Sequence, residues 1–132
     1  MGTNNASSNE TETSGIMPES EGNVLCIRHS GVISMAQANI IRKYLEDIAE
    51  KYDSLRGLVF YDEDYKGYTV EAAEISLHFM MDLGEKAEKI AYVNAPETRK
   101  KLNETVPELA GAEIRYFAKE ELQDAISWVK SD

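Results

Sequence analysis

Cysteine is nearly absent from this chain, since Cys26 is its only one among 132 residues. A single cysteine cannot form an internal disulfide or a thiolate metal cluster, and such sparse use is typical of a reducing compartment. No run of about 18 apolar residues occurs, so we expect no stable membrane insertion. The N-terminus lacks the charged start and the apolar stretch of a secretory signal. Together these absences predict a cytoplasmic protein.

Basic residues are also few. The chain has 14 Lys and Arg residues against 24 Asp and Glu residues, and its formal net charge is −10. A protein of this sign repels the phosphate backbones of DNA and RNA, because binding them depends on clustered Lys and Arg. In this chain the basic residues are scattered. We therefore expect no nucleic-acid partner.

Large apolar side chains are scarce in the first 22 residues. This segment is rich in Ser, Thr, Asn and Glu, and its only sizeable apolar residues are Met1, Ile16 and Met17. Such a composition buries too little surface to offset the entropy that is lost on ordering. The sequence therefore predicts a disordered tail over residues 1–22 and a single folded domain over residues 23–132.

The folded part contains four units in which a strand is followed by a helix. Each expected strand is a short, unbroken apolar run, as in strands covered on both faces of a parallel sheet. The expected strands cover residues 24–33, 57–61, 90–93 and 112–117. The expected helices cover 34–52 and 69–87, start at Pro96 after the third strand, and cover 120–129. The pattern predicts an α/β fold of four β-α units, with a mostly parallel four-stranded sheet and packed helices.

Two of the helix starts have polar caps. Ser34 followed by Gln37 is a capping box, in which each side chain bonds the backbone N–H of the other residue. Thr69 is the expected cap of the second helix. Five residues of the first helix have helical spacing and are expected to face the core, namely Ile41, Tyr44, Leu45, Ile48 and Tyr52.

Residues that could do catalysis or hold a metal do not form a coherent set. Glu74, His78 and Asp82 share one helix face, which favours the polar stripe of an amphipathic helix, and no second ligand-rich segment completes a metal shell. His29 is the only other histidine. Cys26 lies in an apolar strand and is expected to be a small buried residue rather than a nucleophile. We therefore expect no enzyme, no cofactor and no metal.

An acidic segment, 62–67, follows the second expected strand. It resembles a calcium loop only in part, because Lys66 and Ala73 stand where oxygen ligands are needed. The segment still lies at the edge of the sheet where α/β proteins bind ligands. The alternative is a turn packed by its own aromatic residues. The candidate ligand-binding or regulatory turn consists of Asp62, Asp64, Tyr65, Lys66, Tyr68 and Thr69.

The second expected helix is apolar over an unusually wide arc. On a helical wheel its acidic residues and His78 fall within roughly 80°, whereas apolar or small residues cover roughly 240°. One face of a sheet cannot cover so wide a surface. The excess is expected to meet other helices of the same subunit, a second copy of the chain, or an apolar ligand. The candidate interface consists of Ile75, Phe79, Met80, Met81 and Leu83.

Four segments of the folded part carry a resemblance to a known family. They are Lys66-Gly67-Tyr68, Lys89-Ile90-Ala91-Tyr92-Val93, Glu113-Ile114-Arg115-Tyr116-Phe117 and Asp124-Ala125-Ile126-Ser127-Trp128-Val129. With these segments, residues 23–132 resemble the SpoIIAA-like family, which has the STAS-domain fold and is similar to lipid-binding Sec14-type domains. The matching residues are core and turn positions, so the resemblance implies a fold rather than an activity.

The resemblance also bears on regulation. Anti-sigma factor antagonists of this fold present a phosphorylatable serine at the start of the second helix, in an Asp-Ser-Ser-Gly turn. In this chain residues 61–70 contain no serine, and Thr69 is the nearest hydroxyl of that class. Thr69 as an unmodified helix cap is the simpler interpretation, and it is worth about 1 kcal/mol.

The sequence thus predicts a non-enzymatic, STAS-like binding or interaction domain that self-associates through the second helix. A homodimer or another protein partner is expected. One alternative, from the Sec14 resemblance, is a carrier of an apolar or lipid-like small molecule. The other is a phospho-regulated partner-switching protein related to anti-sigma factor antagonists, modified at Thr69 or at a serine of the tail.

Overall fold

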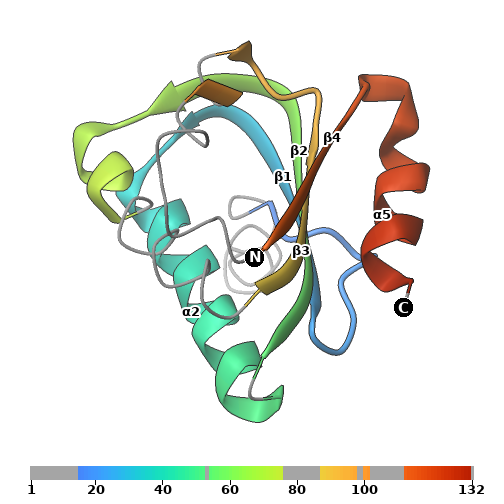
Figure 1. Cartoon of the computed structure of the whole chain (residues 1–132). Coiled ribbons are helices and arrows are strands. Elements are labelled where there is room, and N and C mark those ends of the chain that lie inside the picture. Colours follow the sequence, from blue (N-terminus) through green and yellow to red (C-terminus); the bar gives the residue numbers. More distant parts are fainter. Residues whose placement is uncertain (1–14, 53, 76–86, 98–99, 102–111, 132) are drawn as a thin grey trace, which may run out of the picture.

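The computed structural model describes residues 15–52, 54–75, 87–97, 100–101 and 112–131 (Figure 1). Within these ranges the sheet has four strands, which are β1 (Val24–Ile33), β2 (Leu55–Tyr68), β3 (Ala87–Val93) and β4 (Glu113–Phe117). They lie in the order β1-β2-β3-β4, and every neighbouring pair is parallel. The expected parallel α/β fold is confirmed. The strand order follows the chain order, so these strands contain no reversal of the kind at which open sheets usually bind ligands.

Helices cover both faces of this sheet. Figure 1 shows α2 (Met35–Tyr52) on one face and α5 (Leu122–Lys130) on the other. A short 3₁₀ helix, η2 (Lys119–Glu121), precedes α5. Residues 70–75, 97 and 100–101 are also helical. The centres of β1, β2 and β3 are thus buried on both sides, which explains why they are apolar runs in the sequence, whereas β4 has no fully buried residue.

Each face of the sheet contributes to its own core. Alternate strand residues point to opposite faces, so Leu25 and Ile27 pack toward α2, whereas Val24 and Cys26 pack toward α5. Ile41 and Leu45 complete the first core from the buried stripe of α2. Ala125, Ile126 and Val129 complete the second core from α5. The two cores explain why both helices are amphipathic.

The start of α2 has the predicted capping box. The N–H of Ser34 donates to Oε1 of Gln37 at 3.0 Å, and the N–H of Gln37 donates to Oγ of Ser34 at 3.3 Å. Of the residues expected in the core, Ile41 and Leu45 are buried and Ile48 is partly buried. Tyr44 and Tyr52 are exposed, so their assignment to the core was wrong. They lie at the border of the apolar stripe, where a tyrosine can keep its hydroxyl in water.

The helix α5 approaches the sheet closely at Gly57. A Cβ atom at this position would lie 2.7 Å from Cβ of Val129 and 3.0 Å from its carbonyl oxygen. Only glycine allows this distance without a shift of the helix. Gly57 therefore sets how deeply α5 packs onto β2.

The predicted disordered tail is wrong for residues 15–22. Met17 is buried in the core on the α5 face, and its N–H donates to the carbonyl of Cys26 at 2.8 Å. Isolated antiparallel bridges join Ile16 to Ile27 and Glu21 to Val24, so this segment adds a fifth extended element beside the four expected strands. Polar composition misled the prediction, because backbone hydrogen bonds and one buried methionine hold the segment. Residues 1–14 lie outside the described residues.

The second strand is longer than predicted. Residues 62–68 were expected to form a turn, but they extend β2 and pair with residues 29–33 of β1, with register shifts after His29 and Gly31. Thr69 caps the helical residues 70–75 as expected, since its Oγ1 accepts the N–H of Ala72 at 3.2 Å. The expected end of that helix near Ala87 was wrong, because Ala87 begins β3.

Candidate functional site

A buried histidine–aspartate pair joins β1 to β2. The register of the two strands places His29 directly opposite Asp62. Nδ1 of His29 lies 2.8 Å from Oδ1 of Asp62, and each residue is 2% exposed. Side chains of this type are rarely so buried unless they are paired, as these two are. Both residues follow apolar runs and lie near the carboxyl end of the sheet.

Asn94 adds a third polar residue at the same level of the sheet. Val93 pairs with Tyr61, so the next residue along β3 comes beside Asp62. Its Nδ2 donates to the backbone carbonyl of Asp62 at 2.8 Å, and its backbone has a φ of 60°. Asparagine tolerates this left-handed conformation better than most residues. Asn94 therefore ends β3 and ties its end to β2.

A ladder of stacked rings crosses the α2 face of the sheet, with one ring from each strand. His29 stacks on Phe60 with ring centroids 5.4 Å apart, Phe60 on Tyr92 at 5.3 Å, and Tyr92 on Tyr116 at 5.6 Å. Nζ of Lys100 lies 5.4 Å from the centroid of the Tyr116 ring at the far end. Stacked rings fix the side-chain register across parallel strands. The ladder thus links the His29–Asp62 pair to the opposite edge of the sheet.

This polar cluster has a structural role. A general base must come within hydrogen-bonding distance of a substrate. His29 and Asp62 are almost fully covered, and their facing atoms bond each other. The cluster therefore holds the ends of β1, β2 and β3 together beneath the surface described next.

Three exposed apolar side chains come from chain segments that meet near this end of the sheet. Val32 is 54% exposed, Met35 is 50% exposed and Val70 is 76% exposed, the highest values among the large apolar residues in the described ranges. Val32 is the last residue but one of β1, Met35 begins α2 and Val70 begins the next helix. The N–H of Thr69 donates to the carbonyl of Ile33 at 3.0 Å, which brings these three chain segments together. Figure 1 shows residues 70–75, in yellow-green, beside the start of α2. We call Val32, Met35 and Val70 the tip.

The predicted ligand-binding turn is a strand that leads into the tip. Asp62 is buried in the pair with His29, whereas Asp64 and Lys66 are exposed along β2. Tyr65 and Tyr68 belong to β2 and pair with Gly31 and Ile33 through the backbone. Thr69 is the helix cap at the base of the tip. The six predicted residues therefore lie along β2 and at the start of the following helix rather than in a turn.

The predicted interface of the second helix is described only at its beginning. Ile75 is half-buried. Phe79, Met80, Met81 and Leu83 lie outside the described residues. Val70 is a residue of the same helix that sequence analysis did not select, although its exposure is what the wide apolar arc predicts. The sequence could have indicated Val70, because it directly follows the helix cap Thr69, at the point where the chain leaves the sheet.

Cys26 has the environment of an unreactive thiol. Its side chain is fully buried on the α5 face. Burial raises the pKa of the thiol to about 11, because the thiolate would lose its hydration. In the described ranges no three His, Cys, Asp or Glu residues are grouped so that they could hold a metal ion. None of the helices described there is long and apolar enough to span a membrane.

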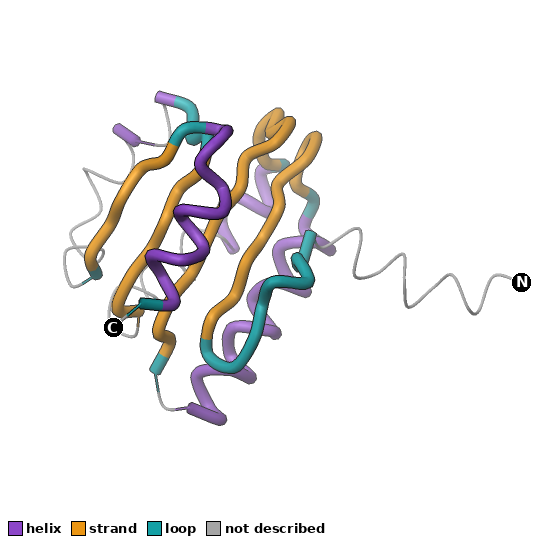
Figure 2. The backbone as a smooth tube through the Cα atoms, turned by 90° about the vertical axis from the view of Figure 1, so that its right-hand side faces the viewer, coloured by secondary structure: helices purple, strands orange, loops and turns teal. Residues whose placement is uncertain are grey.

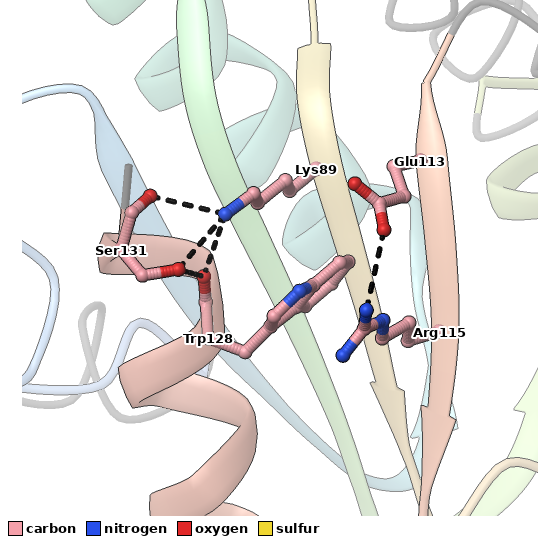
Figure 3. A network of polar contacts seen from close by, with 5 residues as sticks. All are labelled: Lys89, Glu113, Arg115, Trp128 and Ser131. Carbon is pink, nitrogen blue, oxygen red and sulfur yellow. Dashed lines mark hydrogen bonds and ion pairs between the residues drawn. The ribbon is translucent and has the colours of Figure 1, made fainter.

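A polar cavity of about 510 Å³ lies at the opposite, amino end of the sheet. Its lining consists of Asn23, Arg56, Glu88, Lys89 and Ser131. Figure 3 shows that the Lys89 ammonium is engaged by the end of α5. It donates to the carbonyls of Trp128 and Ser131 at 3.1 and 3.0 Å and to Oγ of Ser131 at 2.9 Å. Lysine thus satisfies the last carbonyls of the helix, as cations at helix ends do. The charge of Lys89 therefore has a structural role.

The sequence that forms these four parallel strands, with α2 on one face and α5 on the other, matches the profile of one protein family. The SpoIIAA-like family profile matches residues 24–130. The chain belongs to the SpoIIAA-like family. The match covers all four strands, α2 and α5, and it begins with β1. No curated protein and no solved structure matches the chain.

Membership in the SpoIIAA-like family confirms the STAS-like fold that the sequence resemblance implied. In this SpoIIAA-like chain the tip lies where the resemblance places a regulatory turn, at the start of the second helix. The buried pair of His29 and Asp62 was missed by sequence analysis, because 33 residues separate its members. The only sequence signal for it is a polar residue after each of two apolar runs.

Proposed function

We propose that this SpoIIAA-like protein is a non-enzymatic binding domain that docks a protein partner through the tip. The observation that supports the proposal is the exposure of Val32, Met35 and Val70 at the meeting point of three chain segments. Exposed apolar side chains are common singly, but a group of them surrounded by polar residues is typical of an interaction surface.

The rim of the tip indicates the chemistry of the partner. In the described part of the second helix, Glu71 and Glu74 are exposed, and Glu63 and Asp64 are exposed along β2. Lys66 is the single exposed basic residue described between Asp62 and Ile75, and Arg28 of β1 lies 4.0 Å from Glu63. An acidic rim repels anionic lipid surfaces and favours a basic one. The expected partner is therefore a protein surface with an apolar centre and Lys or Arg around it.

The region beneath the tip supports binding rather than chemistry. The imidazole of His29 and the carboxylate of Asp62 bond each other away from solvent. Such a cluster keeps the ends of β1 and β2 in one arrangement, so the tip is held in place before a partner arrives. Preorganisation of this kind lowers the entropy cost of binding.

Thr69 favours a regulated form of this function. Its Oγ1 caps the helix that begins with Val70, so it lies at the base of the tip. A phosphate on this hydroxyl would place negative charge at a helix N-terminus, which is favourable, but beside the apolar side chains that a partner would cover. Phosphorylation of Thr69 would thus weaken docking. The test is a comparison of Thr69→Glu with Thr69→Ser, of which only Thr69→Glu should reduce partner binding.

Two alternatives depend on residues beyond the described part of the second helix. Self-association through that helix involves Phe79, Met80, Met81 and Leu83, and an apolar or lipid-like ligand would use the same wide surface. Both stay predictions. Native mass spectrometry of the purified protein reports a bound lipid and the subunit count together.

Co-purification tests the docking proposal. A partner should be recovered with the wild-type chain and with Tyr52→Asp, which adds the same charge at an exposed residue at the far end of α2. Its recovery should be lost with Val70→Asp and with Met35→Asp. The purified partner should then bind with the same pattern. Equal recovery by all four proteins would overturn the role of the tip.

A further inference from the structure

The two edges of the sheet differ in the described structure. The β1 edge is covered by residues 15–21, where the N–H of Arg28 donates to the carbonyl of Gly15 at 2.7 Å and Glu21 bridges Val24 in both directions. At the opposite edge, β4 pairs with β3 on its inner side, and no described strand lies beyond it. Figure 2 shows β4 as the outermost strand, to the left of α5. Natural sheets usually cover or disrupt such an edge.

The backbone of β4 has a defined outward side. The carbonyl of Phe117 accepts the N–H of Asn94 at 2.9 Å, so the polar groups of Phe117 point toward β3. Because these groups alternate along a strand, those of Arg115 and Glu113 also point inward, whereas those of Ile114 point outward. Ile114 is therefore a residue at which β4 can accept and donate hydrogen bonds to another strand.

The side chains beside this edge carry opposite charges. Glu113 and Arg115 lie on the same face of β4, 3.5 Å apart, and each side chain is more than half exposed. The helix α5 packs mainly over β2 and β3, and it contacts this face of β4 through the Trp128 ring, which lies beside Arg115 (Figure 3). The guanidinium carbon of Arg115 lies 4.8 Å from the centre of that ring. Both charges thus lie on the outermost strand of the described sheet.

We propose that β4 pairs in antiparallel direction with β4 of a second copy of this chain. In this arrangement Ile114 faces the partner's Ile114 across a twofold axis, and the two exchange both backbone hydrogen bonds. The strand is then self-complementary, because Glu113 faces the partner's Arg115 and Arg115 faces the partner's Glu113. These are the closely spaced, non-hydrogen-bonded positions, where opposite charges stabilise a strand pair.

The other registers that the backbone permits are less favourable. A shift by two residues places Arg115 opposite the partner's Arg115, and like charges directly opposite destabilise a strand pair. A further shift places Arg115 opposite the partner's Phe117 and leaves Glu113 without an opposite charge. Charge therefore favours one register. Pairing in this register gives a closed dimer in which both subunits use the same surface. Its formation does not depend on the tip, which lies at the β1–β2 side of the sheet and stays accessible in both subunits.

Charge exchange tests this dimer. The wild-type protein should dimerise in sedimentation equilibrium, whereas Arg115→Glu and Glu113→Arg should each raise the dimer dissociation constant by about tenfold or more. The double variant Glu113→Arg/Arg115→Glu restores both opposite-charge pairs and should dimerise like the wild type. Urea unfolding of each variant shows whether the monomer is intact. Both side chains are exposed, so the fold should tolerate these changes.

Cysteine cross-linking tests the register. Chains with Glu113→Cys and chains with Arg115→Cys should form a disulfide dimer when mixed, and neither should cross-link alone. Cross-linking of Arg115→Cys with itself would indicate the shifted register and contradict the proposal. A protein that stays monomeric at all concentrations, or a dimer that the charge variants leave intact, would overturn it. A dimer that Val70→Asp disrupts would instead assign self-association to the second helix.

Discussion

The Nδ1 atom of His29 lies 2.8 Å from the Oδ1 atom of Asp62, and this buried contact ties β1 to β2 beneath the tip. The contact explains how two strands continue past the end of their neighbour β3 while keeping a fixed arrangement. The two residues lie directly opposite each other in the parallel pairing of β1 and β2. The pair therefore helps to hold the strands that carry the proposed docking surface.

We expect the His29–Asp62 pair to be strongly coupled. Asp62→Ala should lower the free energy of unfolding by about 3–5 kcal/mol, because it takes the carboxylate away from a buried imidazole. The double variant His29→Phe/Asp62→Ala keeps a ring against Phe60 and should cost at least about 1 kcal/mol less than the sum of the single changes. Urea unfolding of the four proteins measures this. Additive losses would mean that the two side chains do not act as a pair.

Asn94 separates the effect of backbone conformation from that of its side chain. Asn94→Gly keeps the left-handed backbone and loses the hydrogen bond to Asp62, so stability should fall by about 0.5–1.5 kcal/mol. Asn94→Ala also forces a Cβ atom into that conformation and should cost about 1 kcal/mol more. Thermal unfolding of both variants checks the order. The account of this residue is wrong if alanine is tolerated as well as glycine.

The close contact at Gly57 makes it sensitive to one added methyl group. Gly57→Ala should destabilise the protein by about 1–3 kcal/mol, since the new Cβ meets Val129 at 2.7 Å and α5 must move. The movement should also change the fluorescence of Trp128, the only tryptophan of the chain. The exposed residue Ser127 of the same helix supplies a control, Ser127→Ala. Unchanged unfolding and emission in Gly57→Ala would contradict the packing described for α5.

Burial of Cys26 predicts a loss of stability at alkaline pH. Because the folded protein raises the pKa of this thiol to about 11, it holds the proton more tightly than the unfolded chain does. The stabilisation is therefore fully present below the ordinary thiol pKa of about 8.5 and is lost as the pH rises toward 11.

The comparison of wild type with Cys26→Ala isolates this effect from other titrating groups. Between pH 8.5 and pH 10 the unfolding free energy of the wild type should fall more steeply, by up to about 1.4 kcal/mol per pH unit. The thiol should also resist alkylation until the protein is denatured. Parallel pH curves for the two proteins would show that Cys26 is not the group responsible.

Local patterns predicted the parts of the fold that depend on neighbours in sequence. The capping box of Ser34 and Gln37 and the cap at Thr69 follow from spacing alone, and apolar runs indicated the centres of β1, β2 and β3. The parallel arrangement followed because such runs are typical of strands that are covered on both faces. These features do not require knowledge of distant contacts.

Features that depend on pairing between distant segments were missed. The polar residues 62–68 read as a turn, yet they form a strand because the end of β1 supplies the backbone partners. Residues 15–22 read as disordered for a similar reason, since Met17 becomes buried only once α5 and β1 form a pocket for it.

Site-specific photo-crosslinking in cells tests most directly whether the tip is a protein-docking surface. A photoreactive residue placed singly at positions 32, 35 and 70 should give cross-links to the same protein partner. The same residue at positions 44 and 52, which are also exposed and apolar, should not. Cross-links to that partner from all five positions, or from positions 44 and 52 alone, would contradict the account, as would cross-links from the tip to lipid only.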